Sequence, residues 1–208
     1  MKPKRIPLFP LDVVLFPGMP LPLHIFEPRY KLMIRRCSDQ QLEFGVVLAR
    51  ESGIAGTGCT AAITQVVRTY PDGKMDILTE GRTAYQVLQV FEEKPYYEAD
   101  VQYLEDDLEI AVRSVDNRKK LLELYNRCHQ LLLNRSPAQL ELRSGILLSF
   151  QIAGELPLDL DFRQELLELR SESARQDHLR ERLAEWAPQL EHHSRVRQKA
   201  GGNGHGLG

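Results

Sequence analysis

The stretch His24-Ile25-Phe26-Glu27-Pro28-Arg29-Tyr30 gathers residue types that could carry acid–base chemistry. His24 and Glu27 could act as a pair, because an imidazole and a carboxylate are common general acids and bases. The other interpretation is structural, since Glu27 and Arg29 lie where a strand gives way to a helix, a position suited to an ion pair or a cap. Arg82 is a further candidate partner for Glu27. We favour the structural interpretation, because such networks are common in folded domains.

The glycine-rich segment Gly53-Ile54-Ala55-Gly56-Thr57-Gly58 suggests a phosphate-binding loop. The third glycine of G-x-G-x-x-G is missing, because Ala61 stands in its place. A strand should follow this segment, so no helix N-terminus would face an anion. We therefore expect a flexible hairpin connection.

Other catalytic and metal-binding patterns are missing from the sequence. It contains neither G-x-S-x-G nor a Walker A motif. Cys128 and His129 lie in an apolar helical repeat, and the later histidines lack the ligand spacing that zinc requires. Cys59 follows the glycine-rich segment, where we expect an accessible thiol. The sequence predicts a protein that is not an enzyme and has no cofactor and no metal.

The composition is that of a globular protein. The 208 residues are 42% hydrophobic, and 27 Lys and Arg oppose 29 Asp and Glu, a net charge of −2. Proteins that bind nucleic acid or anionic lipid usually carry a clear basic excess. The apolar runs are too short to span a bilayer, and three scattered cysteines form no disulfide framework. We expect a cytoplasmic protein without a membrane partner.

The elements that must position these residues begin with extended chain. Seven prolines in the first 28 residues exclude a helix or a central strand there. Pro28 suits the first turn of a short helix that should end near 37–39. Residues 42–105 then alternate between β-branched runs and turn signals, including a hairpin at Tyr70-Pro71-Asp72-Gly73-Lys74 and a break at Glu80-Gly81. About six short strands in a small barrel or sandwich are predicted.

After residue 106 the apolar residues recur at helical spacing. Ser136-Pro137-Ala138-Gln139 is a capping box that opens one helix, Asp161 begins the cap of another, and the last helix should end at Pro188. The fold class is α+β. Residues 1–106 should form a β-barrel subdomain with one short helix, 107–188 a helical subdomain, and 189–208 a disordered tail.

Several stretches resemble the Lon protease N-terminal, or Lon substrate-binding, domain. They are Ile6-Pro7-Leu8-Phe9-Pro10-Leu11, Leu21 to Tyr30, Pro71-Asp72-Gly73 and Leu156-Pro157-Leu158. The resemblance covers about residues 5–187. It implies a six-stranded pseudo-barrel related to PUA-like folds, followed by a helical subdomain. The full protease continues with an ATPase and a peptidase, and from the missing Walker A motif and the short sequence we expect a free-standing Lon domain.

The resemblance makes a non-catalytic module that binds unfolded or extended polypeptide the leading hypothesis. A hydrophobic groove between barrel and helices, together with main-chain pairing at a proline-limited barrel edge, would hold the segment. The module could serve an ATP-dependent protease in trans. The candidate contact residues are Phe16, Met19, Leu21, Met33 and Met75. The signature residues His24, Phe26, Glu27, Arg29, Tyr30 and Arg82 are interpreted as structural.

Two alternatives come from other classes of protein. A PUA-like RNA-binding module would use Arg29, Arg35, Arg36 and the basic segment 195–199, although the net charge disfavours nucleic acid. A small-molecule sensor would have its pocket at the mouth of the barrel. The sequence specifies no oligomeric state.

Overall fold

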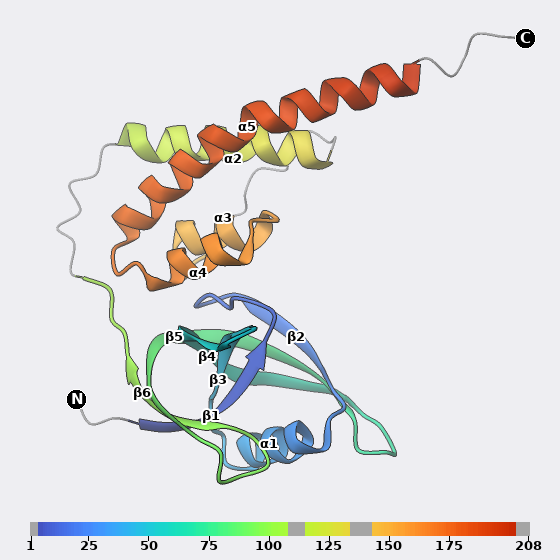
Figure 1. Ribbon diagram of the computed structural model, residues 1–208, viewed down its shortest axis with the longest axis vertical. Coiled ribbons are helices and arrows are strands. Elements are labelled where there is room, and N and C mark those ends of the chain that lie inside the picture. The colour runs from blue at the N-terminus through green and yellow to red at the C-terminus, as the bar shows by residue number, and fades with distance from the viewer. Residues whose placement is uncertain (1–3, 108–114, 134–142, 203–208) are drawn as a thin grey trace, which may run out of the picture. The chain divides into compact units, whose positions relative to one another are not determined.

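The computed structural model describes residues 4–107, 115–133 and 143–202 (Figure 1). The chain divides into two compact units, the first made of residues 1–107 and 144–170, the second of residues 108–143 and 171–208. Within the described residues, the first unit contains the sheet and three helices, and the second contains two long helices.

A six-stranded sheet forms the centre of the first unit. Its strands are β1 (Lys4–Leu11), β2 (Pro20–Ile25), β3 (Phe44–Arg50), β4 (Gly53–Thr69), β5 (Met75–Phe91) and β6 (Glu98–Tyr103). Their order is β2-β5-β4-β3-β1-β6, and β5 also pairs with β6, which closes the sheet. Closure is possible because β5 is long: its first half pairs with β2 and β4, and its last residues pair with β6. The predicted α+β class with a six-stranded barrel is confirmed.

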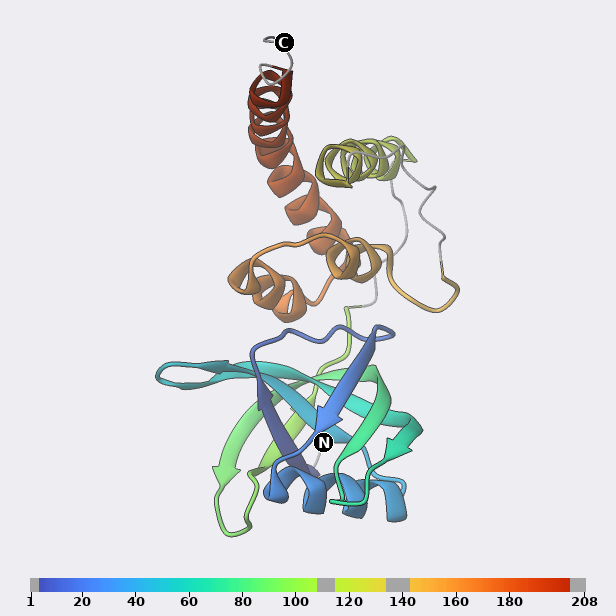
Figure 2. The same ribbon diagram turned by 90° about the vertical axis from the view of Figure 1, so that its right-hand side faces the viewer.

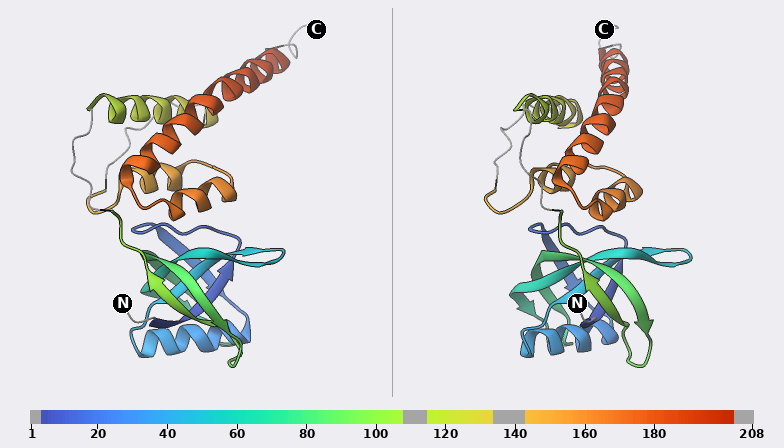
Figure 3. Two further views of the ribbon diagram at one scale, coloured as in Figure 1. Left: turned by 60° about the vertical axis from the view of Figure 1, so that its left-hand side comes forward. Right: turned by 90° about the vertical axis from the view of Figure 1, so that its left-hand side faces the viewer.

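Two local predictions in this unit are confirmed. Helix α1 (Pro28–Asp39) has its proline at the first turn, as expected from the fixed φ of that residue. The hairpin at 70–74 joins β4 to β5, with Gly73 at φ +79° and its N–H donating to the Tyr70 carbonyl oxygen at 2.9 Å. Figures 2 and 3 show α1 at one end of the barrel, away from the short helices α3 (Leu148–Glu155) and α4 (Leu160–Glu168).

Strand β1 corrects the prediction that the proline-rich segment excludes a central strand. β1 lies between β3 and β6 although it contains Pro7 and Pro10. Residues 4–7 pair with β6 and residues 8–11 pair with β3. Each half of β1 therefore pairs with only one neighbouring strand. A proline, which has no N–H, is tolerated on the unpaired side of each half.

The glycine-rich segment is part of β4 and is not a hairpin connection, so that prediction is wrong. Gly58 lies opposite Tyr85 in the register of β4 and β5. A Cβ at Gly58 would overlap the Tyr85 hydroxyl and lie 2.5 Å from the Val46 carbonyl oxygen. Glycine is needed here because the Tyr85 ring crosses the strand. Gly81 also lies within a strand, β5, where the Phe16 backbone approaches too closely for a side chain.

The helices α3 and α4 belong with the barrel in one unit. The ring of Phe150 on α3 stacks on Phe16 with centroids 5.0 Å apart, and Gln164 of α4 donates a hydrogen bond to the Thr57 carbonyl oxygen of β4 at 3.0 Å. The sequence had grouped these helices with the others as residues 107–188. The cap of α4 is Asp159, which accepts from Phe162 N, and not Asp161. The predicted capping box at 136–139 lies outside the described residues.

The second unit packs α2 (Val115–Leu133) against α5 (Glu172–Gly202). The Sγ of Cys128 on α2 donates to the Leu183 carbonyl oxygen on α5 at 3.8 Å. Helix α5 continues through Pro188 to residue 202, so the predicted helix end and the predicted disorder of residues 189–202 are wrong. Pro188 removes one N–H donor from α5, and packing against α2 compensates for this loss. Ala187 of α5 is buried, and Arg127 of α2 forms an ion pair with Glu191 of α5, beyond the proline. Residues 203–208 lie outside the described part of the chain.

Candidate functional site

The predicted signature separates into a hydrogen-bonded His24–Asp76 pair and a Glu27–Arg29 ion pair. His24 Nδ1 lies 2.6 Å from Asp76 Oδ1, and the Tyr70 hydroxyl donates to Asp76 Oδ2 at 2.7 Å. These two hydrogen bonds, that of His24 first, lower the pKa of the Asp76 carboxyl. The partner of Glu27 is Arg29, at 2.8 Å, with both side chains more than a third exposed. His24 and Glu27 are therefore bound to different partners and do not form the acid–base pair that their spacing suggested.

Arg82 corrects a second expectation about Glu27. Its Nη1 lies 2.7 Å from Glu80 Oε1, two residues away on β5. The predicted Arg82–Glu27 pair is wrong, because a carboxylate on the same face of the same strand meets the guanidinium first. Glu27 occupies the cap position of α1 without a side-chain cap hydrogen bond. Phe26 is exposed and stacks beside His24, and Tyr30 is buried against Phe9.

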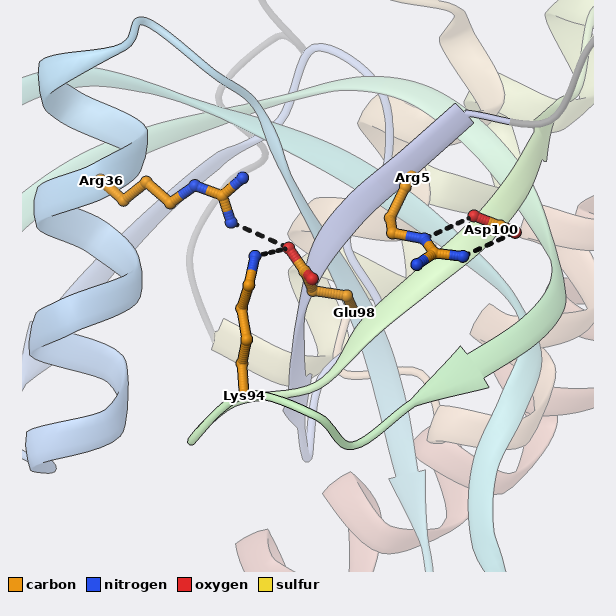
Figure 4. Close-up of polar contacts among 5 residues, drawn as sticks. All are labelled: Arg5, Arg36, Lys94, Glu98 and Asp100. Atoms are coloured by element: carbon orange, nitrogen blue, oxygen red, sulfur yellow. Dashed lines mark hydrogen bonds and ion pairs between the residues drawn. The ribbon is translucent and has the colours of Figure 1, made fainter.

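Arg36, a candidate for RNA contact, is held inside a polar network (Figure 4). Its Nη1 donates to the Tyr96 hydroxyl at 2.9 Å and to Glu98 Oε1 at 2.8 Å. Lys94 Nζ donates to the same Glu98 oxygen at 2.7 Å. This network joins α1 to β6, and a separate Arg5–Asp100 pair joins β1 to β6 (Figure 4). Arg36 is thus neutralised by a protein carboxylate, which weighs against a phosphate-binding role.

The five apolar residues predicted to contact a polypeptide do not form one exposed face. Phe16, Met33 and Met75 are buried in the core. Met19 and Leu21 are half-buried, and the Met19 side chain lies against Gly154 of α3. Position in a loop or at the end of an element had suggested exposure. Burial depends on α3 and on the sheet, which the local sequence does not specify.

The sequence predicted main-chain pairing at a proline-limited barrel edge, but it did not identify the free edge of β4, which contains no proline. β3 pairs with β4 as far as Phe44 opposite Ala61. From residue 62 to residue 69, β4 has β5 as its partner on one side and no strand on the other among the described residues. Side chains 64–69 are all exposed, with Val66 at 42% and Val67 at 54%. The free edge of β2 contains Pro20 and Pro22, which lack N–H groups, whereas residues 62–69 contain no proline.

A pocket of about 520 Å³ adjoins the start of this edge. It is lined by Cys37, Ser38, Gln41, Leu42, Glu43, Ala62, Ile63 and Arg82. The pocket lies where the chain before β3 leaves the sheet, so the end of α1 forms its opposite wall. At the other end of the edge, Lys31 of α1 donates to the Asp72 carbonyl oxygen at 3.1 Å. We call the free edge 62–69 and this pocket together the β4 edge site.

The β4 edge site offers unpaired backbone groups for main-chain recognition, although its pairing with β5 shifts register between Ile63 and Gln65 and between Val66 and Arg68. The outward N–H and C=O groups of an unpaired edge can form a ladder with an added extended segment. Leu42 and Ile63 offer apolar contacts in the pocket. Among the described residues, no three His, Cys, Asp or Glu side chains converge on a possible metal position. None of the described helices is long and apolar enough to cross a membrane.

Comparison with known proteins identifies the family. The model of the ATP-dependent protease La (LON) substrate-binding domain matches residues 5–185. The chain belongs to this LON substrate-binding domain family. A Lon N-terminal domain protein from Xanthomonas campestris has a similar structure, with a TM-score of 0.65 and 25% identity over 85% of this chain and 96% of that one. The N-terminal domain of a Mycobacterium avium complex Lon protease shares the fold at a TM-score of 0.64 and 16% identity, over 87% of this chain and 98% of that one.

Curated LON family relatives are much longer than the region they share with this chain. Lon protease 2 of Herpetosiphon aurantiacus is 29% identical over 178 residues, which are 79% of this chain and 22% of that protein. The Lon protease of Parabacteroides distasonis is 31% identical over 110 residues, 49% of this chain and 13% of that protein. The chain thus spans about a fifth or less of these two relatives. The LON family assignment supports a substrate-binding role and the resemblance that the opening motif indicated.

Proposed function

We propose that this chain binds extended segments of unfolded polypeptide, without catalysis, by adding them as a strand to the β4 edge site. The observation that carries the proposal is the free, proline-less edge of β4 at residues 62–69. Family membership supports the choice of polypeptide as the ligand, because the matching model describes a substrate-binding domain. Since relatives with this domain are Lon proteases, we also propose that bound segments are passed to an ATP-dependent protease.

Strand addition suits a ligand of varied sequence. An incoming segment pairs through its backbone, which all residues share, and each main-chain hydrogen bond contributes about 0.5–1.5 kcal/mol net. A folded protein has its backbone already paired and cannot supply such a strand. The pocket with Leu42 and Ile63 adds an apolar contact at one end. Binding should be weak for one segment and strengthened where several segments or domains act together.

The test uses fluorescence anisotropy with a labelled, permanently unfolded polypeptide, its native folded form and a single-stranded RNA in parallel. Selective binding of the unfolded chain is expected. An eight-residue Val/Thr peptide is then compared with two versions that are N-methylated at alternate residues, either the odd or the even ones. One methylated version should lose binding at least tenfold, because its N–H groups face β4, and the other should bind like the parent.

Two substitutions at valines of similar exposure test whether the polypeptide binds at the β4 edge site. Val67→Lys should weaken binding, because a charged, long side chain on an edge opposes strand addition. Val196→Lys is the control, since Val196 is 52% exposed on α5, close to the 54% of Val67. Equal binding by both methylated peptides would refute strand addition. Preference for RNA over every polypeptide would favour the nucleic-acid alternative instead.

A further inference from the structure

We propose that the segment bound at the β4 edge site carries acidic residues at the end that lies over the 70–74 hairpin. This inference rests on the proposed strand addition and names the class of segment that binds best. It is drawn from the distribution of charge along the edge.

Three cations surround the hairpin end of the edge. Arg68 is an exposed residue of the edge itself, and its guanidinium lies 4.5 Å from the Tyr70 ring centroid. Lys31 of α1 donates to a backbone oxygen of the turn, and a Cβ at Gly73 would lie 2.9 Å from Arg35 Nη2. Within the described residues, none of these three cations has a carboxylate at ion-pair distance, so all three can meet an incoming anion.

The acidic side chains near this end are already paired. Asp72 lies 2.8 Å from Lys74 Nζ, and Asp76 binds His24 and Tyr70. Asp76 also interacts electrostatically with Arg68, and Asp72 with Lys31. Two carboxylates therefore face four cations at this end, Lys31, Arg35, Arg68 and Lys74, which leaves an excess of positive charge. At ordinary ionic strength such exposed charges act over about 8–10 Å, which reaches the end of an added strand.

The pocket end carries the opposite charge. Glu43 lines the pocket, and the Arg82 there is neutralised by its pair with Glu80 at 2.7 Å. The β4 edge site is thus positive at the hairpin and negative at the pocket. A segment with acidic residues at the hairpin end alone is complementary to this gradient, and acidic residues over Glu43 would be repelled.

The direction of the bound strand follows from the existing ladder. β3 pairs antiparallel with β4, and its ladder stops where the free edge begins. A segment that continues this antiparallel ladder runs from the hairpin to the pocket, because β4 runs from the pocket to the hairpin. Its acidic residues should therefore lie at its N-terminal end.

The experiment compares three labelled peptides with one Val/Thr core. They carry Asp-Asp at the N-terminal end, Asp-Asp at the C-terminal end, or Asn-Asn at both ends, and anisotropy is measured at 50 and 500 mM salt. The N-terminal acidic peptide should bind about fivefold more tightly than the neutral one at low salt, with the difference largely lost at high salt. The Arg35→Gln/Arg68→Gln double variant should remove this preference and leave the neutral peptide unaffected. Arg195→Gln, an exposed arginine on α5, is the control.

The outcomes separate the two proposals. If all three peptides bind equally, the charge inference is refuted while strand addition stands. If the neutral peptide does not bind at all, the proposed function fails. A C-terminal preference that the double variant abolishes would support the charge inference with a parallel strand. If single-stranded RNA displaces the acidic peptide at equal concentration, the three cations bind nucleic acid, and the inference is overturned.

Discussion

Tyr85 on β5 donates a hydrogen bond from its hydroxyl to the Val46 carbonyl oxygen on β3 at 3.1 Å, although β4 lies between these strands. The ring passes over Gly58, which is its register partner on β4, and its hydroxyl also lies over Gly45. The contact is fully buried, with Tyr85 at 0% exposure. Burial raises the pKa of the Tyr85 phenol well above its usual range, so it remains a neutral donor.

This arrangement predicts which glycine of β4 tolerates a side chain. Gly58→Ala should destabilise the chain by about 2–3 kcal/mol, because the new methyl group overlaps Tyr85 and the Val46 backbone. Gly56→Ala is the matched control, since a Cβ there meets nothing within 4 Å. Tyr85→Phe should cost about 1 kcal/mol through the lost hydrogen bond. Urea unfolding measures all three, and equal stability of the two alanine variants would contradict the packing described for Tyr85.

Glu98 should make stability depend on pH. Burial opposes its ionisation, but hydrogen bonds from Lys94 and Arg36 outweigh burial and lower its pKa. A carboxyl whose pKa is lower in the folded chain stabilises the fold above its ordinary pKa of about 4.3, and loses that contribution as the pH falls through the folded value.

Glu98→Gln should therefore reduce the free energy of unfolding by about 1–2 kcal/mol at pH 7, with the difference shrinking below about pH 4. Asp161→Asn is the control, because Asp161 pairs with Arg50 on the surface with its side chain 74% exposed. Urea titrations at pH 7 and pH 3.5 make the comparison. A Glu98→Gln effect of the same size at both pH values would mean that the ionised carboxylate is not the source of stability.

The three thiols should be inert in the folded chain. All three are buried, which corrects the expectation that Cys59 is accessible. Burial raises the pKa of Cys37 to about 11 and that of Cys128 to about 11, and raises that of Cys59 as well. A thiol reagent at pH 8 should label less than one cysteine within minutes, and all three in urea. Val67→Cys supplies an exposed thiol as a positive control, and rapid native labelling of Cys59 would contradict its burial.

Pro188 should limit the stability of α5. It is exposed in the interior of the helix, where it removes one N–H donor and crowds the preceding turn. Pro188→Ala should stabilise the second unit by about 1–3 kcal/mol. Gln189→Ala, at the next exposed position, should change stability far less. Thermal unfolding followed by circular dichroism at 222 nm measures both, and a destabilised Pro188→Ala variant would show that the proline is required for packing.

Some features of this chain follow from its residues alone. The start of α1 depends on the fixed φ of Pro28, and the hairpin before β5 depends on the positive φ of Gly73. The opening motif, together with later stretches, also identified the family over about residues 5–187, nearly the residues 5–185 that the family model matches. These signals are short in range or carried by a long motif, so no knowledge of distant contacts was needed.

The tertiary structure determined which residues are exposed and which strands and side chains pair with one another. Met33 and Met75 were predicted to contact a ligand, but both are buried, on α1 and β5 respectively. Pro188 reads as a helix end, yet contacts with α2 continue the helix. The free edge of β4 exists because the β3 ladder stops at Phe44, and no local pattern specifies a register between distant strands. Burial and strand pairing depend on contacts between residues that are far apart in the sequence. A local sequence pattern indicates only the backbone preferences of a few neighbouring residues.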